Sequence, residues 1–536
     1  MQTHGAHGGM AALLLVCSVA AVALVVVWMR HVTSLRRDSS KGAPDAPLPR
    51  GSMGWPLIGE TLAWIRDPPT WADAHVARYG PVFKTHLLFR PTVFVSGGDN
   101  VRALYRKEGR EVEGLWPAST VRLLGDVLSN AKAAAHSRRR RALAGAYSSK
   151  AVATYVPDIV RVVGRTLSEW ERDLGVGHAH AGGGGARMQS TVGLSHDVVP
   201  LVKRLMLRVA WEVIVSFPSG DPRCDTMATL FSTWKDGLFS FPIDLPFTAF
   251  GKALRARSGI IAIIRANVAR LRAQQAASVA AGEDLPHVHG VMARLLREHP
   301  ADAAGGPSAS QEVTDATLCD EALLQLFAGH DTTTSTALGL LWRTAQHQEW
   351  QGRLRDEQTR VVESHGAELT PDALGAMPVL DRVINEVLRL LSPTGGGFRR
   401  ARTSFELAGV QVPAGATILY SLIATHRDAA AFAHPLTFQP DRFEATSKGA
   451  GADEPAASPP STWAASAASS PSFLPFGGGA RSCIGRNIAM AQLRVLAASL
   501  LRRFKWRVDG DDNAVEWSTF PIPLPRHGLQ LVLSRV

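Results

Sequence analysis

The sequence predicts a mainly α-helical protein with small peripheral β-sheets. Apolar residues recur at the 3.6-residue spacing of an amphipathic helix over several long stretches, whereas strand-like segments are few and short. Hydrophobic residues make up 46% and charged residues 20% of the 536 positions, which is ordinary for a packed globular protein. The pattern excludes a regularly alternating β/α fold and an all-β fold. The predicted helices cover 198–215, 257–280, 315–347, 350–363, 379–391 and 486–505, and the predicted strands 82–88, 92–95, 405–407, 410–412, 417–420 and 528–533.

The N-terminal region predicts a membrane anchor. Residues 11–29 carry no charge, and a helix of that length spans roughly 28 Å, close to the hydrocarbon thickness of a bilayer. Lys and Arg follow this stretch and none precedes it, which places the rest of the chain in the cytosol. We therefore expect an anchor over 1–30 and a basic, proline-rich hinge over 31–54. A cleaved signal peptide and an organelle transit sequence are the alternatives.

The rest of the chain, 55–536, shows neither an internal repeat nor a convincing linker, so we expect it to form a single domain. Three low-complexity segments interrupt it, at 174–186, 301–310 and 446–470. Gly, Ala, Ser and Pro bury too little apolar surface to offset the entropy of ordering them. We expect these three segments to be flexible surface insertions.

Charge and cysteine content narrow the classes of function. The chain has 58 basic and 47 acidic side chains, for a net charge of +11, but most of the excess arginines are scattered, and we expect no nucleic-acid partner. The four cysteines include no C-x-x-C pair, which excludes a disulfide scaffold and a zinc site built mainly of thiolates. A single cysteine remains available as a nucleophile or as a metal ligand.

One such cysteine lies in a glycine-rich segment near the C-terminus, FLPFGGGARSCIG at 473–485. Glycines let the backbone approach a flat ligand closely, and Arg481 can neutralise a carboxylate. Cys483 directly precedes a predicted helix, whose N-terminal N–H groups favour a thiolate. Phe476 can cover one face of a planar ring. A thiolate, a cation and bare backbone beside a plane are what a haem with an axial cysteine ligand requires. Gly477 and Gly485 complete this set of residues.

This segment resembles the F-x-x-G-x-R-x-C-x-G signature of the cytochromes P-450, the haem-thiolate monooxygenases. The resemblance implies the fold of that family, haem b (iron protoporphyrin IX) as the cofactor, and Cys483 as the axial ligand of its iron. It extends from about residue 51 to the C-terminus.

A second match lies in the predicted helix 315–347, where A-G-H-D-T-T at 328–333 is similar to the distal-helix motif of the family. By this resemblance, Gly329 beside Ala328 permits close approach to the haem and opens the helix locally. Asp331 relays protons, and the Thr332 hydroxyl hydrogen-bonds the distal oxygen. We expect His330 to be a packing or solvent-side residue and not an iron ligand.

Further matches concern the residues that support the haem. His136 and Arg140 occupy the positions of the family's W-x-x-x-R motif, which implies that they face the haem propionates, with His in place of Trp. The other arginines of 138–141 are expected to present a positive face to an acidic electron donor. The family's E-x-x-R and P-E-R-F patterns imply a buried charge network behind the haem loop, made here of Glu386, Arg389 and Arg442.

Several stretches look like one branch of the family, which holds sterol, brassinosteroid, triterpenoid, abscisic-acid and retinoic-acid hydroxylases. They are 49–62, 79–96, 116–125, 245–257 and 395–401. We therefore expect a monooxygenase that oxidises a lipophilic isoprenoid with dioxygen and with electrons from NADPH-cytochrome P-450 reductase or a comparable donor. The expected location is the endoplasmic reticulum membrane, with the catalytic domain in the cytosol; a chloroplast or other organelle membrane is the alternative.

Three questions stay open at this point. An aromatic-rich patch over 231–250 is either a membrane-facing entrance for the substrate or ordinary core. The chain could instead be a haem-thiolate isomerase or dehydratase that acts on a lipid hydroperoxide without external electrons. It could also be a non-catalytic haem- or lipid-binding protein.

Overall fold

The structure is a computed structural model that describes residues 44–173, 195–281, 290–300, 313–444, 470–510 and 515–536, with isolated positions between 18 and 36. The insertions expected at 174–186 and 301–310, and 446–470 apart from its last residue, lie outside the described residues, as does most of the anchor expected at 11–29. Within the described part of the chain, no helix is both long enough and apolar enough to traverse a bilayer. The chain divides into two compact units.

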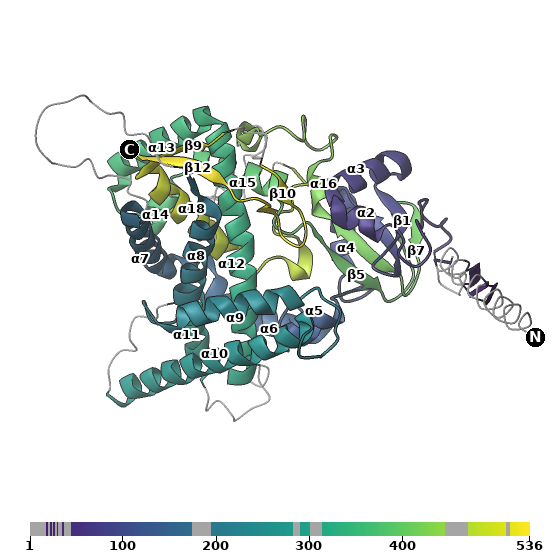
Figure 1. Cartoon of the computed structure of the whole chain (residues 1–536), viewed down its shortest axis with the longest axis horizontal. Coiled ribbons are helices and arrows are strands. Elements are labelled where there is room, and N and C mark those ends of the chain that lie inside the picture. The colour runs from purple at the N-terminus through teal and green to yellow at the C-terminus, as the bar shows by residue number, and fades with distance from the viewer. Residues whose placement is uncertain are drawn as a thin grey trace, which may run out of the picture. The chain divides into compact units, whose positions relative to one another are not determined.

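The first unit comprises the residues up to Leu115 together with Gly396–Asp428. Its sheet has the strand order β1-β2-β8-β5-β3. Strands β1 and β5 of this sheet are labelled in Figure 1. A tight turn at Leu88 and Phe89, both with positive φ, joins β1 to β2 as an antiparallel hairpin. The strands are β1 (Val82–Leu87), β2 (Arg90–Val95), β3 (Val112–Gly114), β5 (Gly396–Ala401) and β8 (Thr417–Ser421), and β6 (Phe405–Leu407) pairs separately with β7 (Val410–Val412). The helices are α2 (Thr61–Arg66), α3 (Pro68–Tyr79), α4 (Gly98–Arg106) and α16 (Leu422–His426).

The second unit comprises Trp116–Gly395 and Ala429–Val536, and it is mainly helical. Its helices are α5 (Ala118–Leu124), α6 (Ala133–Ala144), α7 (Ser149–Asp173), α8 (Val198–Val209), α9 (Arg223–Gly237), α10 (Ala249–Ala280), α11 (Val291–Glu298), α12 (Asp315–Gln346), α13 (Gln348–His365), α14 (Pro371–Gly375), α15 (Pro378–Leu391) and α18 (Arg486–Leu501). Its strands are β4 (Ser195–Asp197), β9 (Phe504–Val508), β10 (Trp517–Ser518), β11 (Leu524–Pro525) and β12 (Gln530–Arg535).

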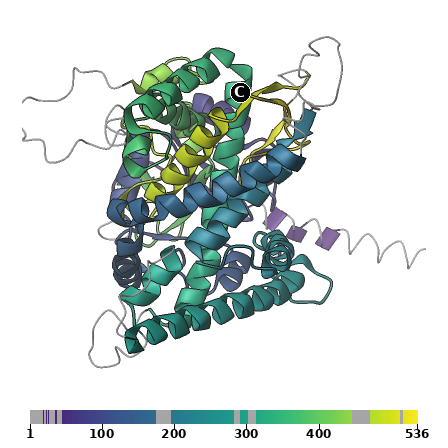
Figure 2. The same cartoon turned by 90° about the vertical axis from the view of Figure 1, so that its left-hand side faces the viewer.

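Helix α12 is the centre of this unit. It contacts α8, α10, α15 and α18, and most of its side chains are buried. A capping box at Thr314 begins the helix, because its hydroxyl accepts the N–H of Thr317 while the Thr317 hydroxyl accepts the N–H of Thr314. Both views show α18, in yellow, beside α7, in blue (Figures 1 and 2). A helix with partners on all sides can carry polar groups that are shielded from bulk water.

The prediction of a mainly helical fold with small sheets is confirmed, with differences at element ends. The helix predicted over 486–505 ends at Leu501, because strand β9 begins at Phe504 and pairs with β12. The helix predicted over 198–215 changes at Ala210 into a π-helical turn, Ala210–Ile214. Helix α7 was not predicted; it contains Pro157, which ordinarily disfavours a helix interior.

Candidate functional site

The cysteine loop, residues 473–485, folds back on itself directly before α18. The Cys483 N–H donates to the Phe476 carbonyl at 2.9 Å, and the Gly477 N–H donates to the Leu474 carbonyl at 2.9 Å. Gly477 has φ 67° and Gly479 has φ 62°, in the left-handed region where side chains are disfavoured. The glycines therefore allow the turn that presents Cys483 at the start of α18.

The Cys483 side chain is exposed, unlike the buried Cys319. The pKa of the Cys483 thiol lies above its usual value, because desolvation raises it more than the Gly485 N–H and the guanidinium groups of Arg140 and Arg486 lower it. A Cβ at Gly485 would lie 3.9 Å from the sulfur, an ordinary contact. Gly485 therefore acts here through its N–H, which supports a thiolate once a metal binds the sulfur.

Helix α6 supplies the cations beside this loop. Arg140 donates to the Ser482 carbonyl at 2.6 Å and to its hydroxyl at 3.1 Å. Burial lowers the pKa of Arg140 and the nearby Cys483 raises it. His136, one turn earlier, is buried. Arg481 donates to the carbonyls of Ser129 and Ala131 at 3.2 and 2.8 Å, so it links the cysteine loop to the segment that precedes α6.

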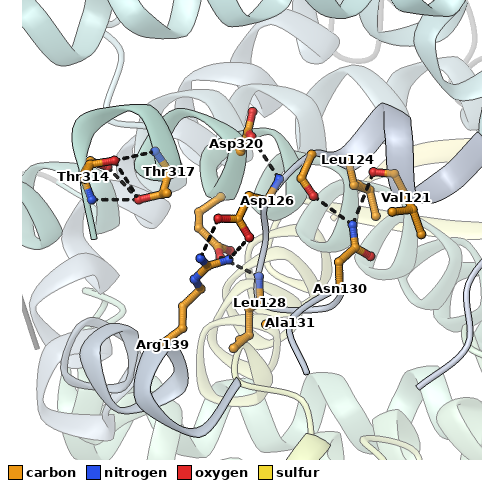
Figure 3. Close-up of polar contacts among 12 residues, drawn as sticks. Val121, Leu124, Asp126, Leu128, Asn130, Ala131, Arg139, Thr314, Thr317 and Asp320 are labelled. Carbon is orange, nitrogen blue, oxygen red and sulfur yellow. Dashed lines mark hydrogen bonds and ion pairs between the residues drawn. The ribbon is translucent and has the colours of Figure 1, made fainter. Parts of the chain in front are cut away.

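A second arginine of α6 is buried, contrary to the expectation that it faces an electron donor. Arg139 is 7% exposed and makes two hydrogen bonds of 2.9 Å to the Asp126 carboxylate. It also lies 3.9 Å from Glu321 of α12, which accepts the Leu128 N–H at 2.6 Å. Figure 3 shows Arg139 pointing toward Asp126 beneath α12. These contacts join α6 to α12, so the arginines of 138–141 lie on different faces of α6.

Helix α12 carries the distal motif. Ala328 is exposed and Thr332 is half-buried, one turn apart on the same face. The Thr332 hydroxyl donates to the Ala328 carbonyl at 2.5 Å. The expected local opening of the helix at Gly329 is wrong for this structure, because α12 is unbroken from Asp315 to Gln346. A Cβ at Gly329 would meet Ile214 Cδ1 at 2.7 Å, so this glycine allows α12 to approach the π-helical turn.

Asp331 points to a different side from Thr332. Its Oδ1 atom lies 2.9 Å from Lys235 Nζ of α9 and 2.6 Å from His330 Nδ1. Burial raises the pKa of the Asp331 carboxyl, but contacts with His330 and Lys235 outweigh this, so the pKa lies below its usual value. No sequence signal linked Lys235 to Asp331, since 96 positions separate them.

The structure brings Glu386, Arg389 and Arg442 together. Arg389 makes hydrogen bonds of 2.8 and 2.9 Å to the two carboxylate oxygens of Glu386, and both side chains are fully buried. Arg442 Nε lies 3.1 Å from Glu386 Oε2. The two arginines also donate to carbonyls of 433–437, so this network fastens the chain ahead of the cysteine loop to α15.

The residues present fit a haem. An exposed thiol at a helix N-terminus is the donor expected for haem iron in a thiolate-ligated site. Positive-φ glycines leave bare backbone beside that thiol, and Arg140 and His136 lie on the helix that contacts the same loop. The exposed Ala328 and the half-buried Thr332 provide a small, weakly polar face on α12.

The comparisons with known proteins agree with this site. The sequence profile of the Cytochrome P450 family matches residues 49–531. The chain is 32% identical to human Cytochrome P450 26C1 over 95% of this chain and 92% of the relative, and 31% identical to zebrafish (Danio rerio) Cytochrome P450 26B1 over 91% and 87%. Among solved structures, a retinoic-acid-bound cyanobacterial CYP120A1 has a TM-score of 0.72 and 28% identity, over 92% of this chain and 100% of that chain.

The fold and the cysteine loop define a haem-containing oxidoreductase. The chain belongs to the cytochrome P450 family, as predicted, and is a monooxygenase that uses haem.

Proposed function

We propose that this chain oxidises a lipophilic isoprenoid substrate, of retinoid-like size and polarity, with dioxygen and with electrons from NADPH-cytochrome P-450 reductase or a comparable donor. The observation that carries the proposal is the exposed Cys483 thiol, supported by the Gly485 N–H and by Arg140. The retinoid class is favoured because the similar cyanobacterial structure is described as bound to retinoic acid.

Cys483, Thr332 and Asp331 would each have a separate role in the reaction. The Cys483 sulfur would hold the haem iron, and the bound haem would supply dioxygen activation and oxygen transfer to a C–H bond. The Thr332 hydroxyl gives its hydrogen to the Ala328 carbonyl, so its lone pairs remain available to accept a hydrogen bond from the distal side. Asp331 would hold and move the protons that the reaction consumes.

We infer a membrane association for the same chain, supported by apolar side chains between α9 and α10. The aromatic-rich patch over 231–250 divides into a buried and an exposed part. Phe231, Trp234, Leu238 and Phe250 are buried in the core, whereas the segment that connects α9 to α10 is exposed. Its exposed apolar residues are Phe239, Phe241, Ile243, Leu245 and Phe247, with exposed fractions of 42 to 73%. Exposed apolar side chains grouped in this way are typical of a surface that binds a membrane or another protein. Together with the apolar stretch 11–29, it favours an endoplasmic reticulum or other organelle membrane.

The membrane proposal has its own test. Replacing Phe241 and Phe247 by Ser should lower the fraction of protein that floats with phosphatidylcholine vesicles when residues 1–30 are removed, because two exposed aromatic contacts with lipid are lost. The exposed Leu436 lies outside this patch and makes Leu436→Ser the control. Equal flotation of all three proteins would contradict the proposal.

The catalytic proposal is tested with the full chain expressed with ample haem precursor. Wild type should show the red-shifted Soret band of a thiolate-ligated reduced carbon-monoxide complex, and Cys483→Ala should lose it. All-trans-retinoic acid should shift the haem spin state and should be converted to a product with one added oxygen atom when reductase and NADPH are present.

Other outcomes identify the alternatives. Turnover of a lipid hydroperoxide without NADPH would indicate an isomerase or dehydratase. A spectral shift with every apolar ligand but no dioxygen consumption would indicate a non-catalytic binding protein.

A further inference from the structure

The connecting segment, residues 125–132, joins the end of α5 to the start of α6. On one side, Arg481 of the cysteine loop donates to two of its carbonyls. On the other side, two carboxyl groups of α12 accept its N–H groups, from Asp126 and Leu128 (Figure 3). The connecting segment is therefore bonded both to the helix that carries the distal motif and to the loop that carries Cys483.

Asp320 of α12 fixes the start of the connecting segment. Its Oδ2 atom accepts the Asp126 N–H at 3.1 Å, and its Oδ1 atom pairs with Arg257 of α10. Arg257 also donates to the Leu123 carbonyl at 3.0 Å. A Cβ at Gly125, where φ is 86°, would lie 2.3 Å from Asp320 Oδ2, so this close approach requires a glycine. Asp320 thus joins α10, α12 and the connecting segment.

Glu321, the next residue of α12, fixes the middle of the connecting segment. Its side chain is 3% exposed, and its Oε1 atom accepts the buried Leu128 N–H at 2.6 Å. Arg139 of α6 lies 3.9 Å away and is itself bonded to Asp126. Burial raises the pKa of Glu321 to about 8, against the opposing effects of the Leu128 N–H and Arg139. The carboxyl is therefore mostly neutral at pH 7 and serves as a hydrogen-bond acceptor.

The connecting segment is folded on itself, so its contacts are coupled. The Asn130 side chain donates to the Gly125 carbonyl at 2.9 Å, and the Asn130 N–H donates to the Val127 carbonyl at 3.0 Å. Val127 and Leu128 are buried in the core. Because of these internal contacts, loosening the segment at α12 should also disturb the carbonyls that Arg481 holds.

We propose that Asp320 and Glu321 are positioning residues that hold the connecting segment as a clasp between α12 and the cysteine loop, and that this clasp slows the loss of haem. A haem held by Cys483 and faced by Thr332 would lie between these two elements, so they must part before it can leave. A segment bonded to both elements opposes that movement. Neither acid belongs to the sequence motifs of the haem site. The inference rests on the haem site and not on the identity of the substrate.

The first test measures haem loss at pH 7 from the haem-loaded full chain to an excess of apomyoglobin, followed by absorbance. Glu321→Met keeps a side chain of similar length but leaves the buried Leu128 N–H without this acceptor, and we expect roughly ten-fold faster haem loss. Glu321→Gln keeps an oxygen that can accept the N–H, so its rate should stay within about two-fold of wild type. Asp320→Ala removes the other contact and should also speed haem loss, so it provides the test if Glu321→Met does not fold.

The matched control is Glu357→Met. Glu357 of α13 is also a buried carboxyl that accepts backbone N–H groups, from Val379 and Leu380 at 2.6 and 3.0 Å, and burial raises its pKa to about 7. These contacts join α13 to α15, away from the connecting segment. We expect a similar fall in urea stability but haem loss at the wild-type rate. Equal rates of haem loss from Glu321→Met and Glu357→Met would overturn the inference.

The second test observes the connecting segment itself. Hydrogen exchange of the haem-loaded chain, followed by mass spectrometry of peptides that cover 125–132, should be faster in Glu321→Met than in wild type and unchanged in Glu357→Met. Faster exchange in Glu321→Met without faster haem loss would show that the segment does not retain the cofactor, and this would overturn the inference. A protein that shows the expected rates of haem loss but oxidises no isoprenoid would instead refute the proposed function and leave the clasp in place.

Discussion

The buried carboxylate Glu386 gives the sharpest stability prediction. It accepts hydrogen bonds from Arg389 Nε and Nη2 at 2.8 and 2.9 Å, from the Gln439 N–H at 2.8 Å and from Arg442 Nε at 3.2 Å. Glu386→Gln keeps the volume but removes the charge and turns an amide NH₂ toward guanidinium donors. The fully buried Arg389 then loses its counter-charge. Removing one partner of a buried pair costs about 3–5 kcal/mol.

Urea unfolding of the haem-loaded protein, followed by haem absorbance, measures this loss. With a slope of about 3 kcal/mol per molar urea, the midpoint should fall by roughly 1 to 1.7 M. The control is Asp441→Asn, because Asp441 adjoins Arg442 in sequence but pairs with Arg353 and Arg382 while 51% exposed. Exposed pairs are worth about 0–1 kcal/mol. A midpoint for Glu386→Gln no lower than that for Asp441→Asn would refute the reasoning.

Three further predictions concern the haem site and its supports. Thr332→Ala should raise hydrogen peroxide released per NADPH, measured with a peroxidase-coupled assay, and unchanged coupling would remove Thr332 from the proton path. Gly477→Ala should lower the free energy of unfolding by about 1–2 kcal/mol, because φ is 67° there, and should lower haem retention on a desalting column. The control is Gly409→Ala, which introduces the same backbone strain, at φ 75°, away from the cysteine loop. Equal haem retention in the two variants would contradict the prediction. Burial raises the pKa of Glu321 from 4.5 to about 8, so the folded state loses stability as pH rises through that window. The Glu321→Gln variant has no carboxyl group at this position and so does not lose stability in this way. The unfolding free energy of the variant minus that of wild type should therefore be higher at pH 8 than at pH 5. A difference that does not change with pH would contradict the prediction.

The cysteine loop could be predicted from the sequence because its residues are contiguous. Cys483, its glycines and the start of α18 lie within a few positions of each other, and the backbone conformations that they require are local. The same holds for the A-G-H-D-T-T run, which a continuous amphipathic pattern places on a helix. The helical fold itself follows from the spacing of apolar residues, which the buried faces of α12, α15 and α18 reproduce.

Other features depend on contacts between distant segments. Four neighbouring arginines look alike in sequence, yet Arg139 is buried against Asp126 and Glu321 while Arg138 and Arg141 are exposed. The pattern of 231–250 predicted one apolar patch, and the packing of α9 against α10 divides it into core and surface. The local sequence pattern indicates whether a side chain is apolar or charged, but it does not indicate which helix or strand will pack over that side chain.

By itself, the sequence determined the family and the helical fold and predicted Cys483 as the haem ligand, because those depend on short-range geometry and on residue types at fixed spacing. Only the tertiary structure decided what Asp331 contacts. Lys235 reaches it from α9, and His330 is held by a carbonyl of α8. These contacts exist because three helices separated along the chain pack together around one buried carboxylate, and the burial that makes the charges interact strongly is itself a product of that packing.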